Sequence, residues 1–201
     1  MILAAAMNPE AFSGVDESIV RLRKGDQDAL TAIIARYQHR LYRYLLRLVR
    51  EPALADDLFQ QTWLRVMEKI GRYDARRSFE GWLFAVAHNL AVDQWRVKGG
   101  ESLDEPTDLG RTGEERLRSG EPDALERLLD FERGAILAAC MHELPVIHRE
   151  VLTLRFEEDM KLEEIAEVAG IPLATVKSRL RRALEGLRAA MAARGKERRG
   201  A

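Results

Sequence analysis

The sequence predicts an all-α protein built from two small helical domains joined by a flexible acidic linker. Alanine, leucine, arginine and glutamate dominate the 201 residues, whereas there are only 6 prolines and 14 glycines, and such a composition favours helices. Apolar residues recur three and four positions apart over long stretches, as they do in amphipathic helices. One segment rich in glycine, proline and acidic residues interrupts this periodicity and separates two helical halves.

The first domain is expected over 12–97. Pro52 interrupts its periodicity, and Asp56 and Asp57 then supply the negative charge that favours a helix N-terminus. A loop is expected at 71–78. The expected helices are a short stretch at 16–24, a longer one within 26–50, a helix from Asp56 to about Ile70 and a helix from Phe79 to about Val97.

The second domain is expected over 123–193, after a linker at 98–122. Acidic residues outnumber basic ones in this linker, and its few leucines are isolated. Helical periodicity resumes near Ala124. Its expected helices cover about 124–141, 145–157, 161–169 and 173–193, and a basic tail follows.

The charge balance and the single cysteine exclude several classes of protein. The 32 Lys and Arg residues against 33 Asp and Glu residues leave a net charge of -1, which argues against a uniformly basic nucleic-acid coat protein but allows local basic segments. Cys140 alone cannot form an intramolecular disulfide. No apolar run approaches the ~20 residues that span a bilayer. A cytoplasmic protein that starts at Met1 or Met7 is expected.

The sharpest local signal is a helix-turn-helix pattern within 162–180. Ala166 is small where two helices must cross closely, and Gly170 lies at the turn, where a positive φ is easily adopted only by glycine. Ile171 and Val176 supply apolar contacts beneath the second helix. This order of residues is typical of DNA-binding helix-turn-helix units.

The outer face of the second helix is a candidate DNA-binding surface. At about 100° per residue, Val176, Leu180 and Ala183 face the core, and a face with several cations lies opposite. Arginine and lysine can bind guanine edges or phosphates, and serine and threonine can reach either. An ordinary solvated helical hairpin with a basic face is the alternative. The candidate residues are Ala174, Thr175, Lys177, Ser178, Arg181 and Arg182.

Both halves of the chain resemble bacterial RNA polymerase sigma factors of the extracytoplasmic-function (ECF) group. The second half resembles their −35-binding domain, and the first half independently resembles their polymerase-clamp and −10 helices. The matching residues are Leu144-Pro145, Arg149 to Leu152, Leu154-Arg155, Glu164 to Ala166, Gly170 to Pro172 and Thr175 to Leu180, together with Asp56 to Leu58, Gln60, Trp63, Phe79, Trp82-Leu83, Asn89-Leu90, Asp93 and Arg96. Gln61, Leu162 and Ala174 depart from the usual residues of the group, and a hydroxyl N-cap is missing at Leu162.

The resemblance implies that the helix after Asp56 docks on the clamp helices of the largest polymerase subunit. Leu64 is an apolar residue amid polar neighbours, as a partner-binding surface would show. A solvated face with one stray leucine is the alternative. The candidate polymerase-binding residues are Asp57, Gln60, Gln61, Leu64, Arg65 and Glu68.

The resemblance also implies that the loop from Tyr73 to Phe79 captures a flipped base of the −10 element. Asn89 offers a donor and an acceptor to a base edge, and the Tyr73 ring offers a stacking surface. Asp93 falls near the apolar arc of its helix, where it needs a partner such as Arg96. The candidate −10 residues are Arg72, Tyr73, Arg76, Arg77, Phe79, Asn89 and Arg96.

The sequence therefore predicts an ECF sigma factor, with no catalytic residues, cofactor or metal. It lacks a Gly-rich phosphate loop and a His-Glu-x-x-His motif, and Cys140, His142 and His148 lack a fourth ligand. The expected partners are core RNA polymerase, through its clamp helices and the flap of the second-largest subunit, promoter DNA and an anti-sigma factor. A sigma-like decoy and a stand-alone helix-turn-helix regulator are the alternatives.

Overall fold

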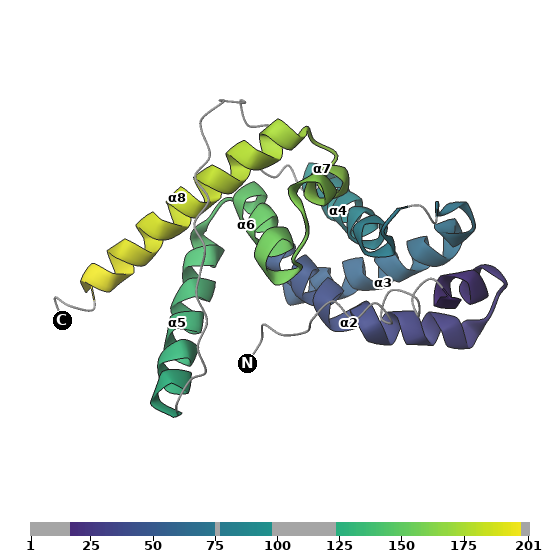
Figure 1. The fold of residues 1–201 in the computed structure, drawn as a ribbon, viewed down its shortest axis with the longest axis horizontal. Coiled ribbons are helices and arrows are strands. Elements are labelled where there is room, and N and C mark those ends of the chain that lie inside the picture. The colour runs from purple at the N-terminus through teal and green to yellow at the C-terminus, as the bar shows by residue number, and fades with distance from the viewer. Residues whose placement is uncertain (1–16, 75–76, 98–123, 198–201) are drawn as a thin grey trace. The chain divides into compact units, whose positions relative to one another are not determined.

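The computed structural model describes residues 17–74, 77–97 and 124–197, and the regular structure in these ranges is helical (Figure 1). The chain forms two compact units, one mainly of residues up to Glu101 and the other mainly of residues from Ser102 on. The predicted linker at 98–122 lies outside the described residues. Within those residues, no helix combines the length and the apolar character needed to cross a membrane.

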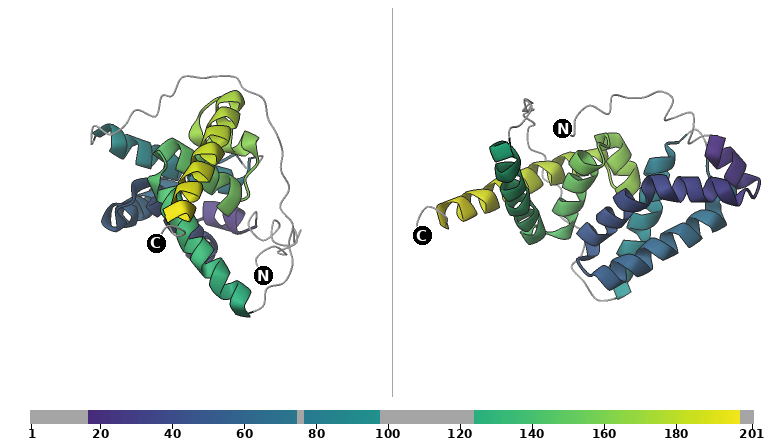
Figure 2. Two further views of the ribbon diagram at one scale, coloured as in Figure 1. Left: turned by 90° about the vertical axis from the view of Figure 1, so that its left-hand side faces the viewer. Right: turned by 90° about the horizontal axis from the view of Figure 1, so that it is seen from below.

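In the first unit, α2 (Gln27–Val49), α3 (Pro52–Lys69) and α4 (Phe79–Val97) pack against one another (Figures 1 and 2). Residues 17–23 are also helical, and a 3-10 turn, η1 (Ile70–Arg72), follows α3. Apolar side chains that are at most 2% exposed form the core: Ile33, Leu41, Tyr44, Leu45, Leu48, Leu58, Val66, Leu83 and Phe84.

The boundary between α2 and α3 differs from the expectation. Arg50 ends α2 in a left-handed conformation with φ 60°, and its N–H donates to the carbonyl of Leu46. Pro52 is the first residue of α3, a position where the N–H that proline lacks would have no helical partner. The expectation that this helix begins at Asp56 is therefore wrong, because Pro52 starts the helix instead of interrupting one.

The second unit contains α5 (Ala124–Glu143), α6 (Val146–Leu152), α7 (Leu162–Ala169) and α8 (Leu173–Glu197), with α8 packed on α5 and α6. The helix expected at 145–157 stops early, since its last part is a π-helical turn, η2 (Thr153–Glu157). Leu162 needs no capping hydroxyl, because the N-cap is Lys161. The N–H of Lys161 donates to Glu164 Oε2 at 2.7 Å.

The turn between α7 and α8 has the predicted geometry. Gly170 ends α7 with φ 64°, and its N–H donates to the carbonyl of Ala166. Ile171 also donates to that carbonyl, at 3.1 Å. Val176 is fully buried on the first turns of α8. The helix-turn-helix prediction is confirmed at these positions.

Replacing Gly170 by alanine should destabilise the second unit by about 1 kcal/mol, because a left-handed residue with a Cβ is strained. No heavy atom beyond its immediate neighbours lies within 4 Å of the new Cβ, so strain is the only cost. Gly134→Ala in α5 is the control: it also enters open space, and it should stabilise the helix by up to about 1 kcal/mol. Urea unfolding followed by circular dichroism measures the free energy of unfolding of both variants. Equal changes in this free energy for the two variants would contradict this account.

Candidate functional site

The outer face of α3 carries all six residues expected to bind polymerase, and all six are exposed. Leu64 is 56% exposed, and Met67, which the sequence analysis did not single out, is 44% exposed. Met67 lies three residues after Leu64, a spacing that could have identified it. Arg65 and Glu68 form an exposed ion pair at 3.5 Å. This surface, Asp57, Gln60, Gln61, Leu64, Arg65, Met67 and Glu68, is called the α3 outer face below.

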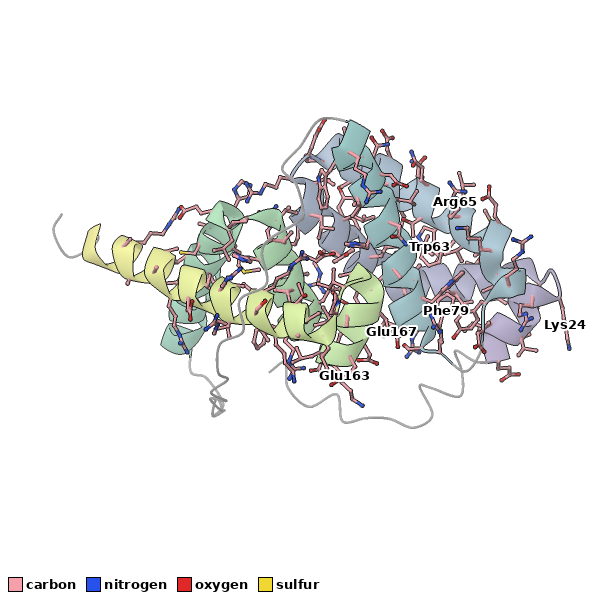
Figure 3. The ribbon with its side chains drawn as sticks, turned by 90° about the horizontal axis from the view of Figure 1, so that it is seen from above. Lys24, Trp63, Arg65, Phe79, Glu163 and Glu167 are labelled. Atoms are coloured by element: carbon pink, nitrogen blue, oxygen red, sulfur yellow. The ribbon has the colours of Figure 1, made fainter. Side chains whose placement is uncertain are left out.

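The opposite, inner face of α3 is buried, and this burial determines which side of the helix is exposed to solvent. Its buried residues are Ala55, Leu58, Thr62, Trp63 and Val66. The hydroxyl of Thr62 donates to the carbonyl of Leu58 at 2.7 Å, so this polar side chain is satisfied within the helix. Figure 3 labels Trp63 and Arg65, two residues apart on α3: Trp63 is 6% exposed, whereas Arg65 is exposed.

Two of the residues expected to bind the −10 element, Tyr73 and Phe79, belong to a buried aromatic cluster. Tyr73 is 5% and Phe79 is 4% exposed. The Tyr73 ring lies 5.7 Å from that of Phe79 and 5.1 Å from that of Trp82, and Tyr37 lies 5.6 Å from Phe79. The Tyr73 hydroxyl donates to the carbonyl of Arg77. The structure thus corrects the expectation of a free stacking ring: mutual packing of large aromatic surfaces holds Tyr73 and Phe79 inside.

An ion pair ties the first turn of α4 to α2 beside this cluster. Arg40 donates to both carboxylate oxygens of Glu80, with Nη1 at 3.2 Å from Oε2. The guanidinium groups of Arg36 and Arg40 each lie 5.9 Å from the centre of the Tyr37 ring. Burial, and then the charge of Glu80, raises the pKa of Tyr37. The ion pair between Arg40 and Glu80 therefore holds the first turn of α4 against α2.

The remaining −10 candidates that the structure describes lie on open surface. Arg72, Arg77, Asn89 and Arg96 are exposed, and Arg76 lies outside the described residues. Asp93 is exposed too and pairs with Arg96 at 3.9 Å. Arg96 is the partner expected for Asp93, and Asp93 lines a pocket together with Val86 and Leu90, although its carboxylate is exposed and not buried.

A pocket of about 180 Å³ opens between α3 and α4. It is lined by Arg65, Lys69, Val86, Asn89, Leu90 and Asp93. Asn89 was expected to bind DNA and Arg65 to bind polymerase, and the structure brings them to one pocket. Lys69 is a residue that the sequence analysis missed; its signal is a spacing of four from Arg65, which places both on one side of α3.

The start of α8 presents most of the residues expected at the −35 element. Ala174 and Lys177 are exposed, and Thr175, Arg181 and Arg182 are half-buried. Ser178 is only 7% exposed, and its hydroxyl donates to the carbonyl of Thr175 at 3.0 Å. The structure therefore does not place Ser178 on open surface, because its hydroxyl turns back onto the preceding turn.

The described residues hold no group of three or more His, Cys, Asp and Glu side chains arranged for a metal ion. Cys140 is fully buried.

The chain matches two family models, "Sigma-70 region 2" over residues 33–100 and "Sigma-70, region 4" over residues 140–189. It is 28% identical to the ECF RNA polymerase sigma factor SigW of Bacillus subtilis, over 87% of this chain and 95% of SigW. It is 32% identical to the RNA polymerase sigma factor CarQ of Myxococcus xanthus, over 84% of this chain and 92% of CarQ.

Among solved structures, the fold is similar to the sigma factor RpoE of Bartonella quintana, which was crystallised with the anti-sigma factor NepR. The TM-score is 0.59 at 20% identity, and the alignment covers 81% of this chain and 96% of RpoE.

Proposed function

The chain belongs to the ECF group of the sigma-70 family, and from this we propose that it binds core RNA polymerase through the α3 outer face and promoter DNA through α4 and α8. It is a transcription initiation factor and not an enzyme. Its task in this proposal is to bring the polymerase to a −35 and a −10 element and to start transcription there.

The observation that carries the proposal is the α3 outer face. Leu64 and Met67 leave large apolar surface in water at the centre of a polar, charged face. Buried apolar centres with polar rims are typical of protein interfaces. The other side of α3 is packed in the core, so this surface is free to bind a partner without unfolding the unit.

The DNA contacts divide between the two units. In α8, Ala174 allows close approach to a groove, and Lys177 and the half-buried Arg181 and Arg182 supply positive charge. In the first unit, Arg72 and Arg77 supply charge next to α4, and Asn89 can read a base edge.

Two further partners complete the proposal. The flap of the second-largest polymerase subunit would dock on the second unit. An anti-sigma factor would hold the chain inactive, as suggested by the similarity to RpoE, which was solved bound to NepR. In this proposal the chain acts in the cytoplasm, on the nucleoid when it is active, and an anti-sigma factor can hold it at the membrane.

Transcription from purified components tests the proposal. Core polymerase with this protein should give transcripts from defined sites on genomic fragments, and core alone should not. Absence of any such transcript contradicts the proposal. A decoy would bind an anti-sigma factor without giving transcripts, and a stand-alone helix-turn-helix regulator would shift duplex DNA in a gel without core polymerase.

A further inference from the structure

One flank of α2 carries a row of arginines to which the proposed function gives no role. Between Ala29 and Arg50 the chain holds five arginines and no Asp or Glu, although the net charge of the protein is -1. At about 100° per residue, the four arginines within α2 fall inside an arc of about 60°. This set is called the α2 arginine row below, and it consists of Arg36, Arg40, Arg43, Arg47 and Arg50.

Contacts within the first unit hold part of this row in place. Arg40 binds both carboxylate oxygens of Glu80 on α4. The guanidinium groups of Arg36 and Arg40 each lie 5.9 Å from the centre of the Tyr37 ring, a distance at which cation and ring attract each other. Arg43 is exposed, and no hydrogen bond or ion pair links it to another of the described residues. Part of the row is therefore ordered before a ligand binds, which lowers the entropy cost of binding.

The length and the chemistry of the row suit a chain of phosphates. Arg36 and Arg50 mark its ends, which are separated by about 21 Å at 1.5 Å per residue. One strand of duplex DNA carries one phosphate charge for about 3.4 Å of rise, so the row can face several phosphates at once. Every residue of the row is an arginine and not a lysine. A guanidinium group can donate two parallel hydrogen bonds to one phosphate, which an ammonium group cannot do.

The row differs from the α3 outer face because it has no exposed apolar centre. Protein interfaces combine an apolar centre with a polar rim, whereas interfaces with DNA are more polar and much more positive. None of the large apolar side chains exposed in the described part of the chain belongs to α2; they are Val20, Leu64, Met67, Leu137, Phe156 and Met191. The row therefore suits a nucleic acid better than an acidic protein.

We propose that the α2 arginine row binds the sugar–phosphate backbone of DNA without reading its sequence. The inference goes beyond the proposed function, which assigns DNA to α4, to the residues next to it and to α8. Contacts to phosphates strengthen binding to all sequences alike and make it depend on salt. Duplex and single-stranded DNA share this backbone, so both belong in the test.

Salt titrations of the full-length protein with fluorescent DNA test the proposal. Two sequences of different base composition are used, each as a duplex and as a single strand. Arg43→Gln should weaken binding to both sequences alike. It should reduce the slope of log affinity against log salt by about 0.9 on duplexes or about 0.7 on single strands, and the form that shows this loss is the form that the row binds. Arg43→Lys should keep the slope, because the charge is retained.

Lys24→Gln is the matched control. Lys24 is exposed in the turn before α2 begins, outside the row (Figure 3), and its substitution removes the same charge from the same unit. Equal salt slopes for Lys24→Gln and Arg43→Gln would overturn the proposal, as would absence of DNA binding by wild type or a loss confined to one of the two sequences. Tighter binding of poly-glutamate than of DNA of the same length would overturn the assignment to a nucleic acid. The proposed function fails separately, if wild type with core polymerase gives no promoter-dependent transcript.

Discussion

Leu64→Asp should lower the affinity for core polymerase by at least about 100-fold. Leu64 is 56% exposed in the free chain, and docking of the α3 outer face would remove it from water. The variant loses this apolar contact and leaves a carboxylate desolvated, and a combined cost of about 3 kcal/mol corresponds to two orders of magnitude in affinity. Titration of labelled protein with core polymerase measures the loss.

Val20→Asp is the matched control for this variant. Val20 is 51% exposed in the helix at 17–23 of the same unit, outside the α3 outer face. The substitution introduces the same charge at a comparably exposed apolar residue. It should leave the affinity for core polymerase within about twofold of wild type, because such surface substitutions change free energies by about 0.5 kcal/mol or less. Equal losses for the two variants would show that charge alone, and not the position of Leu64, governs binding. Unchanged helical circular dichroism establishes that both variants fold.

Lys177→Glu should lower the affinity of the assembled holoenzyme for −35-containing duplex DNA by about tenfold or more, without changing assembly itself. Lys177 is exposed near the start of α8. Loss of a phosphate contact at this position would weaken binding to all DNA sequences alike. Removing that contact should also reduce the salt slope by about 0.9. A gel shift of holoenzyme on a promoter fragment over a range of salt concentrations measures both effects.

Arg194→Glu provides the corresponding control on the same helix. Arg194 pairs with Glu143 on α5 and lies about 25 Å further along α8 at 1.5 Å per residue. The reversed charge breaks the partly exposed ion pair with Glu143, and the loss of such a pair costs about 1 kcal/mol of stability. Promoter affinity should stay near that of wild type. If Lys177→Glu behaved like this control, the start of α8 would not be the −35 surface.

Helical periodicity and turn chemistry were sufficient to predict most of the helices. The bounds of α4 and the turn at Gly170 follow from local signals, because glycine and the apolar spacing act within a few residues. The exposure of the α3 outer face followed from the same spacing. The start of α3 at Pro52 did not follow from the sequence, since proline both ends and starts helices and its effect depends on the preceding backbone.

Side-chain placement in the site depended on contacts between distant residues. Tyr73 was expected to offer a free stacking ring, but its ring packs on Phe79 and Trp82, and Tyr37, far away in sequence, packs against Phe79. Lys69 became a site residue only when α4 brought Asn89 next to it. Neither arrangement follows from the periodicity of a single helix.

The cluster formed by Tyr37, Tyr73, Phe79 and Trp82 also gives the first unit an intrinsic spectroscopic signal. Aromatic rings held in fixed, asymmetric surroundings give near-ultraviolet circular dichroism, a signal that is lost when packing loosens. The Tyr73 hydroxyl donates a hydrogen bond to the carbonyl oxygen of Arg77, just before α4 begins. Any rearrangement of that segment on promoter melting would therefore alter the signal without an added label.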